Sequence, residues 1–329
     1  MTEPVDSKPG DKVAPEAAMP PPVPDHRLIR LIGGGSGGQV WLAQNALGTY
    51  RAVKVVFEKP SPYKHPFGGE LDGVTKFEPI SRQHDGLVDI LHVGGGEAAG
   101  YFYCVMELAD DVHTGPTINP EHYQPRTLAH DLAERKHLPL GECIRLGATI
   151  ASALGFLHRH GLIHRDIKPG NIIFVNGFPK LADTGLVAEM FDSSAYVGTE
   201  GYIAPEGSGT IQADIYSLGK VLYEISTGRD RNDYPELPAH LENDRDGRDL
   251  IQFSKIVVRA CRANPWQRYK SADELMTALL TFQFSHHNPR MEKPRNFLTR
   301  LIAYGGIGVG IGVLLFLLCR IIWLLLHGQ

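Results

Sequence analysis

The chain has 329 residues, 43% of them hydrophobic, and its 33 Lys and Arg nearly balance 37 Asp and Glu. The formal net charge of −4 excludes nucleic-acid binding through a basic surface field, and the composition excludes a collagen-like or wholly disordered chain. The four cysteines have no CxxC spacing, which disfavours a zinc site or a disulfide scaffold.

The first 26 residues are rich in proline and have almost no apolar periodicity. Such a segment buries too little apolar surface to offset the entropy of ordering it, so we expect 1–26 to be a disordered leader. No basic start precedes an apolar stretch, so a cleaved signal peptide is not expected.

From residue 27 the chain begins with strand patterns and turns helical from about residue 127. Short β-branched runs over 28–32, 40–42 and 52–57 predict three strands. The stretch 142–158 is apolar on most sides, which predicts a core helix. The predicted fold class is α+β, with a small β-rich lobe followed by a larger α-helical lobe.

A glycine-rich stretch separates the first two predicted strands. Residues 33–40 fit the pattern GxGxxGxV, whose backbone amides can close over phosphates. A strand follows rather than a helix, which excludes a dinucleotide-binding fold. This stretch therefore predicts a phosphate-binding turn.

The third predicted strand carries Lys54. Its period-two alternation places Ala52, Lys54 and Val56 on one face, and beside a phosphate-binding turn we expect the lysine to face an anion. A helix expected over 67–74 carries Glu70, which could orient the lysine, with Glu78 as the rival.

The segment 164–183 carries the strongest signal for chemistry. Asn-Gly at 176–177 between two apolar runs predicts a hairpin, which would bring Asn171 and Asp183 together. An amide oxygen beside a carboxylate suits Mg²⁺, which shares its coordination with substrate phosphates.

Two more side chains of that segment suit phosphoryl transfer. Asp166 can accept or orient the proton of a substrate hydroxyl. Lys168 can neutralise charge on a phosphoryl group in transfer.

An apolar stretch over 301–326, interrupted only by Arg320, matches the ~20 residues that a helix needs to cross a bilayer. A basic linker over 285–300 precedes it, and the positive-inside bias places the rest of the chain in the cytoplasm. We expect a single-pass anchor in the cell membrane with the C-terminus outside. The GxxxG pairs Gly306/Gly310 and Gly308/Gly312 would allow the anchor to form a homodimer.

Taken together, these motifs resemble the eukaryotic-like (Hanks-type) protein kinases over about residues 27–283. Beyond the glycine turn and the lysine strand, the resemblance rests on the sequences around His164-Arg165-Asp166, Asp183-Thr184-Gly185 and Ala204-Pro205-Glu206. With the anchor, the chain looks like a bacterial serine/threonine kinase.

The resemblance implies the kinase fold over 27–284, with an N-lobe over about 27–106 and a C-lobe over about 110–284. It also implies ATP as the phosphate donor, Mg²⁺ as the cofactor with Mn²⁺ as a substitute, and proteins as substrates.

The resemblance also implies roles for individual residues. Asp166 would be the catalytic aspartate, and Lys168 beside it favours Ser and Thr over Tyr as acceptors. Asn171 and Asp183 would hold the metal ion. The nucleotide-binding residues would be Ile32, Gly33, Gly35, Gly38, Val40, Ala52, Lys54, Glu70, Met106, Glu107, Ala109 and Ile173, with Met106 as the gatekeeper, 107–109 as the hinge and Glu70 paired with Lys54.

Further residues would support the site. By the resemblance, Asp214 braces the catalytic loop and Arg268 pairs with Glu206, while Thr199 is expected to form hydrogen bonds near Asp166. Arg165 is typical of kinases whose activation segment is phosphorylated, and Ser193 or Ser194 is the predicted autophosphorylation site.

The sequence departs from the family at four places. Thr184 replaces the usual phenylalanine, the segment 71–84 is longer than usual, 111–126 is inserted near the mouth of the cleft, and 206–214 is shorter than is typical of the family. We expect a membrane-anchored Ser/Thr protein kinase that phosphorylates itself. The alternative is a pseudokinase, which only Thr184 favours, and a small-molecule kinase is disfavoured because 198–206 resembles a peptide-docking segment.

Overall fold

The structure is a computed structural model that describes residues 21–35, 38–58, 66–96, 99–183, 188–189, 198–239 and 245–287. The predicted leader up to residue 20, the predicted anchor over 301–326, Thr184 and the predicted phosphorylation sites Ser193 and Ser194 lie outside the described residues. By its internal contacts the chain divides into residues 1–282 and 283–329, and the architecture below is that of the first unit.

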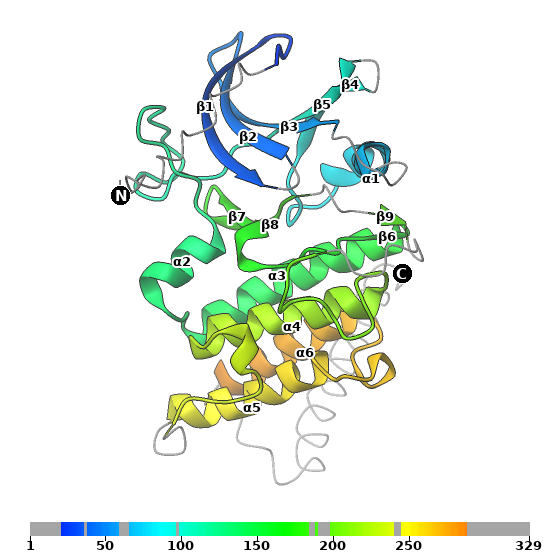
Figure 1. Ribbon diagram of the computed structural model, residues 1–329. Coiled ribbons are helices and arrows are strands. Elements are labelled where there is room, and N and C mark those ends of the chain that lie inside the picture. The colour runs from blue at the N-terminus through cyan, green and yellow to red at the C-terminus, as the bar shows by residue number, and fades with distance from the viewer. Residues whose placement is uncertain are drawn as a thin grey trace, which may run out of the picture. The chain divides into compact units, whose positions relative to one another are not determined.

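The first part of the fold is an antiparallel sheet of five strands with one helix beside it (Figure 1). Its strand order is β1-β2-β3-β5-β4, so the three strands predicted from the sequence are direct neighbours. The elements are β1 (His26–Gly35), β2 (Gly38–Asn45), β3 (Tyr50–Phe57), α1 (Pro66–Ser81), β4 (Ile90–Gly96) and β5 (Tyr101–Met106).

Strand β3 separates its side chains onto the two faces of the sheet. Ala52 and Val56 belong to the main core, whereas Val53 and Val55 belong to a second apolar cluster on the other face. The predicted alternation is therefore confirmed, and it turns Lys54 to the face of the main core.

Helix α1 is longer than the sequence pattern predicted. We expected a helix over 67–74 and an unusually long segment over 71–84, but α1 continues to Ser81, so most of that segment is helix. The Ser81 hydroxyl accepts a hydrogen bond from the Ile90 N–H at 3.1 Å, which attaches the end of α1 to the start of β4.

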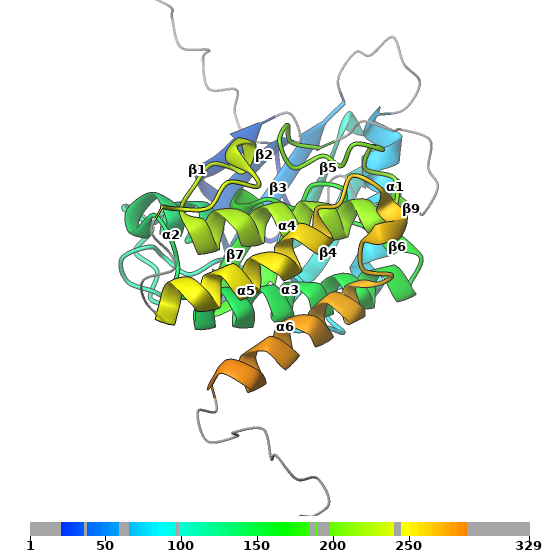
Figure 2. The same ribbon diagram turned by 90° about the horizontal axis from the view of Figure 1, so that it is seen from below.

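The second part of the fold is helical, and Figure 2 shows its long helices packed side by side. The helices are α2 (Leu128–Arg135), α3 (Leu140–Arg159), α4 (Ile211–Thr227), α5 (Arg245–Ala260) and α6 (Ala272–His287). Between α3 and α4 lie β6 (Leu162–Ile163), β7 (Ile172–Val175), β8 (Phe178–Leu181) and β9 (Ala188–Glu189).

Helix α3 is the core helix that its periodicity predicted. Ile150, Leu154 and Leu157 have no exposed surface. Within the described part of the chain, α3 is the one helix long and apolar enough to cross a membrane, but 61% of its apolar window is buried in the protein. Its apolar character is therefore explained by packing against neighbours such as α4.

Local sequence signals set the ends of two helices near the site. The Thr127 hydroxyl accepts a hydrogen bond from the His130 N–H and caps α2. Likewise, the Thr210 hydroxyl accepts a hydrogen bond from the Ala213 N–H and caps α4. Helix α4 ends at Thr227, and the capping residue Gly228 has a φ of 69°, a left-handed conformation that glycine adopts without strain.

Candidate active site

A cavity of about 550 Å³ lies where the sheet meets the helical part. Gly35 pairs with Gly38 at the end of the β1–β2 hairpin, and the other residues predicted to bind nucleotide, metal or substrate all line the cavity. Leu108 of the predicted hinge also lines the cavity, and lining residues that the sequence did not single out are Gly34, Val88, Tyr123, Pro125, Thr127, Gly170 and Ala182.

The glycine-rich stretch forms the turn between β1 and β2. Gly38 has a φ of +113°, and a Cβ at this position would lie 2.4 Å from the Val55 carbonyl oxygen. Only glycine fits there, because both the backbone conformation and the close approach of β3 exclude a side chain. Gly33, Gly34 and Gly38, which flank the turn, thus line the cavity with bare backbone.

Lys54 extends from β3 into the cavity, where its Nζ lies 2.5 Å from Asp183 Oδ1. Burial alone would lower the pKa of Lys54, but the ion pair with Asp183 and the nearby charge of Glu70 raise it above its ordinary value. The lysine therefore stays charged although only 8% of its surface is exposed.

Of the two glutamates considered for orienting Lys54, Glu70 lines the cavity with it. Glu78 lies on a later turn of α1, where it pairs with Arg82 at 2.6 Å and does not line the cavity. The geometry thus favours Glu70 as the partner in the site.

Asp166 and Lys168 line the cavity, and both side chains contact Thr199. Lys168 Nζ lies 2.8 Å from Asp166 Oδ2 and donates to the Thr199 hydroxyl at 2.7 Å. That hydroxyl donates in turn to Asp166 Oδ1 at 2.7 Å. Both carboxylate oxygens are thus held in place, and the hydrogen bond expected between Thr199 and the region of Asp166 is present.

The hairpin predicted from Asn-Gly at 176–177 forms from β7 and β8. At its open end the Ala182 N–H donates to the Asn171 carbonyl at 2.8 Å, which sets Asp183 beside Asn171 along the cavity. The Asn171 amide nitrogen donates to the Asp166 carbonyl and to Asp166 Oδ2, both at 2.8 Å. Its amide oxygen is consequently the atom left to coordinate a cation.

The donor set fits a cation that shares its ligands with a substrate. Among the described residues, no group of three or more His, Cys, Asp or Glu could hold a metal ion. An amide oxygen and one carboxylate are hard ligands, too few for a closed site but suited to Mg²⁺ when phosphate oxygens and water complete its shell.

Asp214 braces the catalytic segment from below. Its carboxylate, buried on α4, accepts hydrogen bonds from the backbone N–H groups of His164 and Arg165, each at 2.9 Å. His158 lies 2.9 Å from the same carboxylate. Burial would raise the pKa of Asp214, but its hydrogen bonds and the nearby histidines keep it below the ordinary value. The aspartate thus stays ionised and orients the loop that carries Asp166.

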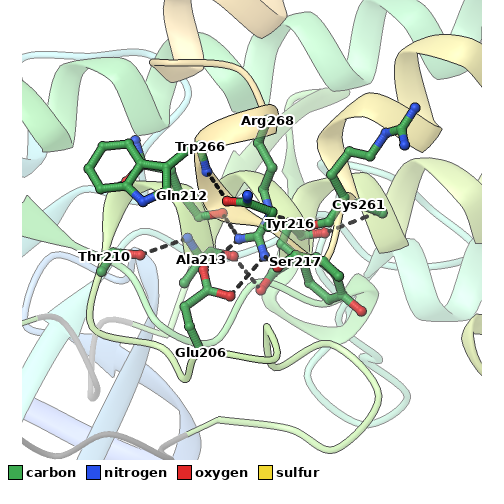
Figure 3. Close-up of polar contacts among 12 residues, drawn as sticks. Glu206, Thr210, Gln212, Ala213, Tyr216, Ser217, Cys261, Trp266 and Arg268 are labelled. Atoms are coloured by element: carbon green, nitrogen blue, oxygen red, sulfur yellow. Dashed lines mark hydrogen bonds and ion pairs between the residues drawn. The ribbon is translucent and has the colours of Figure 1, made fainter.

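Arg268 joins the segment before α6 to the segment before α4 (Figure 3). Its side chain is fully buried and forms two bonds to the Glu206 carboxylate, at 2.6 and 2.8 Å. It also donates to the carbonyls of Arg262, Gln212 and Ala263. The predicted pair is present, and it anchors the segment that follows Thr199.

The insertion over 111–126 supplies cavity residues that the motifs did not reveal. Its position near the cleft mouth was expected, but no periodicity or motif indicated that Tyr123 and Pro125 face the cavity. Thr127, directly after the insertion, also lines the cavity. Its role as the N-terminal cap of α2 is the one local sequence signal that marks this part of the cavity.

Two lobes with a cavity at their junction are the architecture of protein kinases, and residues 26–288 match the family model described as protein kinase domain. The chain therefore belongs to this family.

Its curated relatives include bacterial kinases. The serine/threonine-protein kinase drp72 of Corynebacterium efficiens is 28% identical over 297 residues, which cover 82% of this chain and 53% of that protein. The DNA damage-responsive serine/threonine-protein kinase RqkA of Deinococcus radiodurans is 31% identical over 216 residues, which cover 62% of this chain and 30% of that protein.

The serine/threonine-protein kinase PknA of Mycobacterium tuberculosis is 28% identical over 299 residues, covering 80% of this chain and 63% of that protein. The chain thus spans between 30% and 63% of the length of these three relatives.

Proposed function

We propose that this chain is a Ser/Thr protein kinase that transfers the γ-phosphate of ATP to protein hydroxyls. The observation that carries the proposal is the contact of Asp166 with both Lys168 and Thr199, in a cavity that also holds the Lys54–Asp183 pair. The kinase domain would extend over 27–284, with the hinge at 107–109 between its lobes.

The residues divide the work of phosphoryl transfer. Asp166 would accept the proton of the attacking Ser or Thr hydroxyl. The hydroxyl oxygen would bond to the γ-phosphorus while the bond between that phosphorus and the bridging oxygen of ADP breaks. Lys168 would stabilise charge on the transferring group, and Lys54 would hold the α- and β-phosphates.

A magnesium ion would neutralise the phosphates, held by Asn171 and Asp183. Ile32, Val40, Ala52 and Ile173 would enclose the adenine, as their place around the cavity supports.

The test is phosphoryl transfer to matched peptides. The full-length chain, purified in detergent, would be incubated with MgATP and peptides that differ only in carrying Ser, Thr or Tyr. We expect labelling of the Ser and Thr peptides and little of the Tyr peptide, and loss of labelling in Lys54→Met. Binding of nucleotide without labelling of any peptide would instead support the pseudokinase.

We further propose that residues 301–326 anchor the kinase in the cell membrane and that Ser193 or Ser194 is autophosphorylated. The apolar stretch and the basic linker support the anchor, and Arg165, next to Asp166, supports the phosphorylation site. Cell fractionation of the full chain and of a chain ending before 301 tests the anchor, which predicts release of the shorter form. The pair Gly306/Gly310 would allow two anchors to form a homodimer, which cross-linking of the Gly306→Ile and Gly310→Ile variants tests.

A further inference from the structure

The inserted loop over 111–126 closes on itself at the outer end of the cavity. Asp111 forms an isolated antiparallel β-bridge with Pro125, and the Arg126 N–H donates to the Asp110 carbonyl at 2.8 Å. The two ends of the loop therefore lie side by side. The Phe174 N–H donates to the Arg126 carbonyl at 3.1 Å, which ties this base to β7. Figure 1 shows the loop beside the β1–β2 edge of the sheet.

The Asp111 carboxylate holds the loop in shape from inside. It accepts hydrogen bonds from the N–H groups of His113, Thr114 and Gln124 and from the Thr114 hydroxyl, at 2.8–3.0 Å. Four donors on one carboxylate give the loop a defined conformation, so a side chain on its returning strand has a defined position.

Tyr123 lies on that returning strand and reaches the hinge. Its side chain is 1% exposed, lines the cavity, and donates from its hydroxyl to the Ala109 carbonyl at 3.0 Å. The Tyr123 carbonyl accepts a hydrogen bond from the Arg30 guanidinium of β1. Tyr123 is thus held between β1 and the hinge.

The hinge therefore presents its backbone groups unequally. The Glu107 carbonyl and the Ala109 N–H form no hydrogen bond with another described residue, and both residues line the cavity. The Ala109 carbonyl is engaged by the Tyr123 hydroxyl. The hinge offers one acceptor followed by one donor, and the next acceptor along the chain is covered.

We propose that Tyr123 is a specificity-determining residue that selects adenine over 6-oxopurine nucleotides. Adenine presents a 6-amino donor and an N1 acceptor, which match the Glu107 carbonyl and the Ala109 N–H. The inference rests on the proposed function, which places a purine nucleotide in this cavity.

A 6-oxopurine has the opposite pattern, an oxygen at position 6 and N1–H. It could pair with the hinge only when shifted, with its oxygen on the Ala109 N–H and its N1–H on the Ala109 carbonyl. The Tyr123 hydroxyl already donates to one lone pair of that carbonyl oxygen. The N1–H of an oxopurine must share the oxygen with the phenol or displace it, which weakens its hydrogen bond to the hinge.

The test compares ATP with ITP, which carries the 6-oxo group and N1–H but lacks the 2-amino group of guanine, so added bulk does not contribute. The full-length chain in detergent is loaded with a fluorescent ATP analogue, and ATP or ITP displaces it. We expect the wild type to bind ITP more weakly than ATP. In Tyr123→Phe, which keeps the ring, the ITP/ATP ratio of dissociation constants should fall at least about fivefold.

The control is Tyr101→Phe, which removes a phenol that donates to the Pro22 carbonyl at 3.0 Å and does not line the cavity. A wild type that binds both nucleotides equally, or a ratio that Tyr123→Phe leaves at the Tyr101→Phe value, overturns the proposal. Failure of the fluorescent analogue to bind the wild type refutes the nucleotide site itself, and with it the proposed function.

Discussion

The Thr199 hydroxyl lies 2.7 Å from Asp166 Oδ1, although the two residues belong to different segments of the helical part. The same hydroxyl accepts a hydrogen bond from Lys168. The Thr199 side chain thus orients both Asp166, the proposed base, and Lys168, which would stabilise charge on the transferring phosphoryl group. A hydroxyl held by two partners in this way acts by positioning its neighbours rather than as an acceptor of phosphate.

This contact predicts the effect of substituting Thr199. Thr199→Ala should lower kcat about tenfold or more while the KM for ATP changes little, because the carboxylate loses its orientation and the phosphate-binding groups stay in place. Thr199→Ser keeps the hydroxyl and should retain most activity. Steady-state kinetics would decide, with exposed Thr277→Ala as the control. A Ser variant as inactive as the Ala variant would contradict a role for the hydroxyl.

The two glutamates of α1 give a second prediction. Glu70→Gln should reduce kcat/KM for ATP about tenfold, because Lys54 loses a charge that orients it in the cavity. Glu78→Gln is the matched control on the same helix, since Glu78 pairs with Arg82 and does not line the cavity. Equal kinetics for the two variants would show that α1 does not contribute through Glu70.

The Arg268–Glu206 pair predicts a large loss of stability on a conservative change. Arg268→Lys cannot form the two bonds to Glu206 together with those to three backbone carbonyls, so the free energy of unfolding should fall by at least about 2 kcal/mol. Arg259→Lys, at a largely exposed pair with Glu274, should cost less than about 1 kcal/mol. Urea denaturation measures both, and similar costs would contradict this account of the buried pair.

His84 predicts how stability depends on pH. Its Nδ1 accepts a hydrogen bond from the Gly86 N–H at 3.0 Å, so the ring is neutral in the folded protein. Burial lowers the pKa of His84 below its ordinary value of 6.5. The unfolded chain then binds more protons below pH 6.5, so this stabilisation is complete above pH 6.5 and is lost as the pH falls towards the folded pKa.

The urea midpoint should therefore fall on acidification, and His84→Phe should show a shallower fall although it starts from a lower midpoint. The exposed His113→Gln serves as the control and should follow the wild type. An unchanged slope in His84→Phe would show that another group titrates.

Local patterns predicted the parts of the site that are close in sequence. Alternation along β3 placed Lys54 correctly, and Asn-Gly at 176–177 predicted the hairpin that sets Asp183 beside Asn171. Both signals work because a strand face and a two-residue turn depend on neighbouring residues alone.

Features that depend on tertiary contacts were not predicted. The continuation of α1 to Ser81 follows from its attachment to β4, and no local stop signal marks it. Tyr123 reaches the cavity only because the loop folds back onto Asp110 and β1, which an inserted sequence without periodicity does not reveal. The family resemblance was equally silent there, since the insertion has no counterpart in the motifs.

The central claim is that Asp166 supports phosphoryl transfer from ATP to a protein hydroxyl. The most direct measurement is the intact mass and the phosphopeptide map of the full-length chain after incubation with MgATP, beside Asp166→Asn, which keeps the size of the side chain. The account predicts phosphate on Ser or Thr of the wild type, or of an added basic protein, and none with the variant. Equal phosphate incorporation by the variant, or none by the wild type with either substrate, would contradict it.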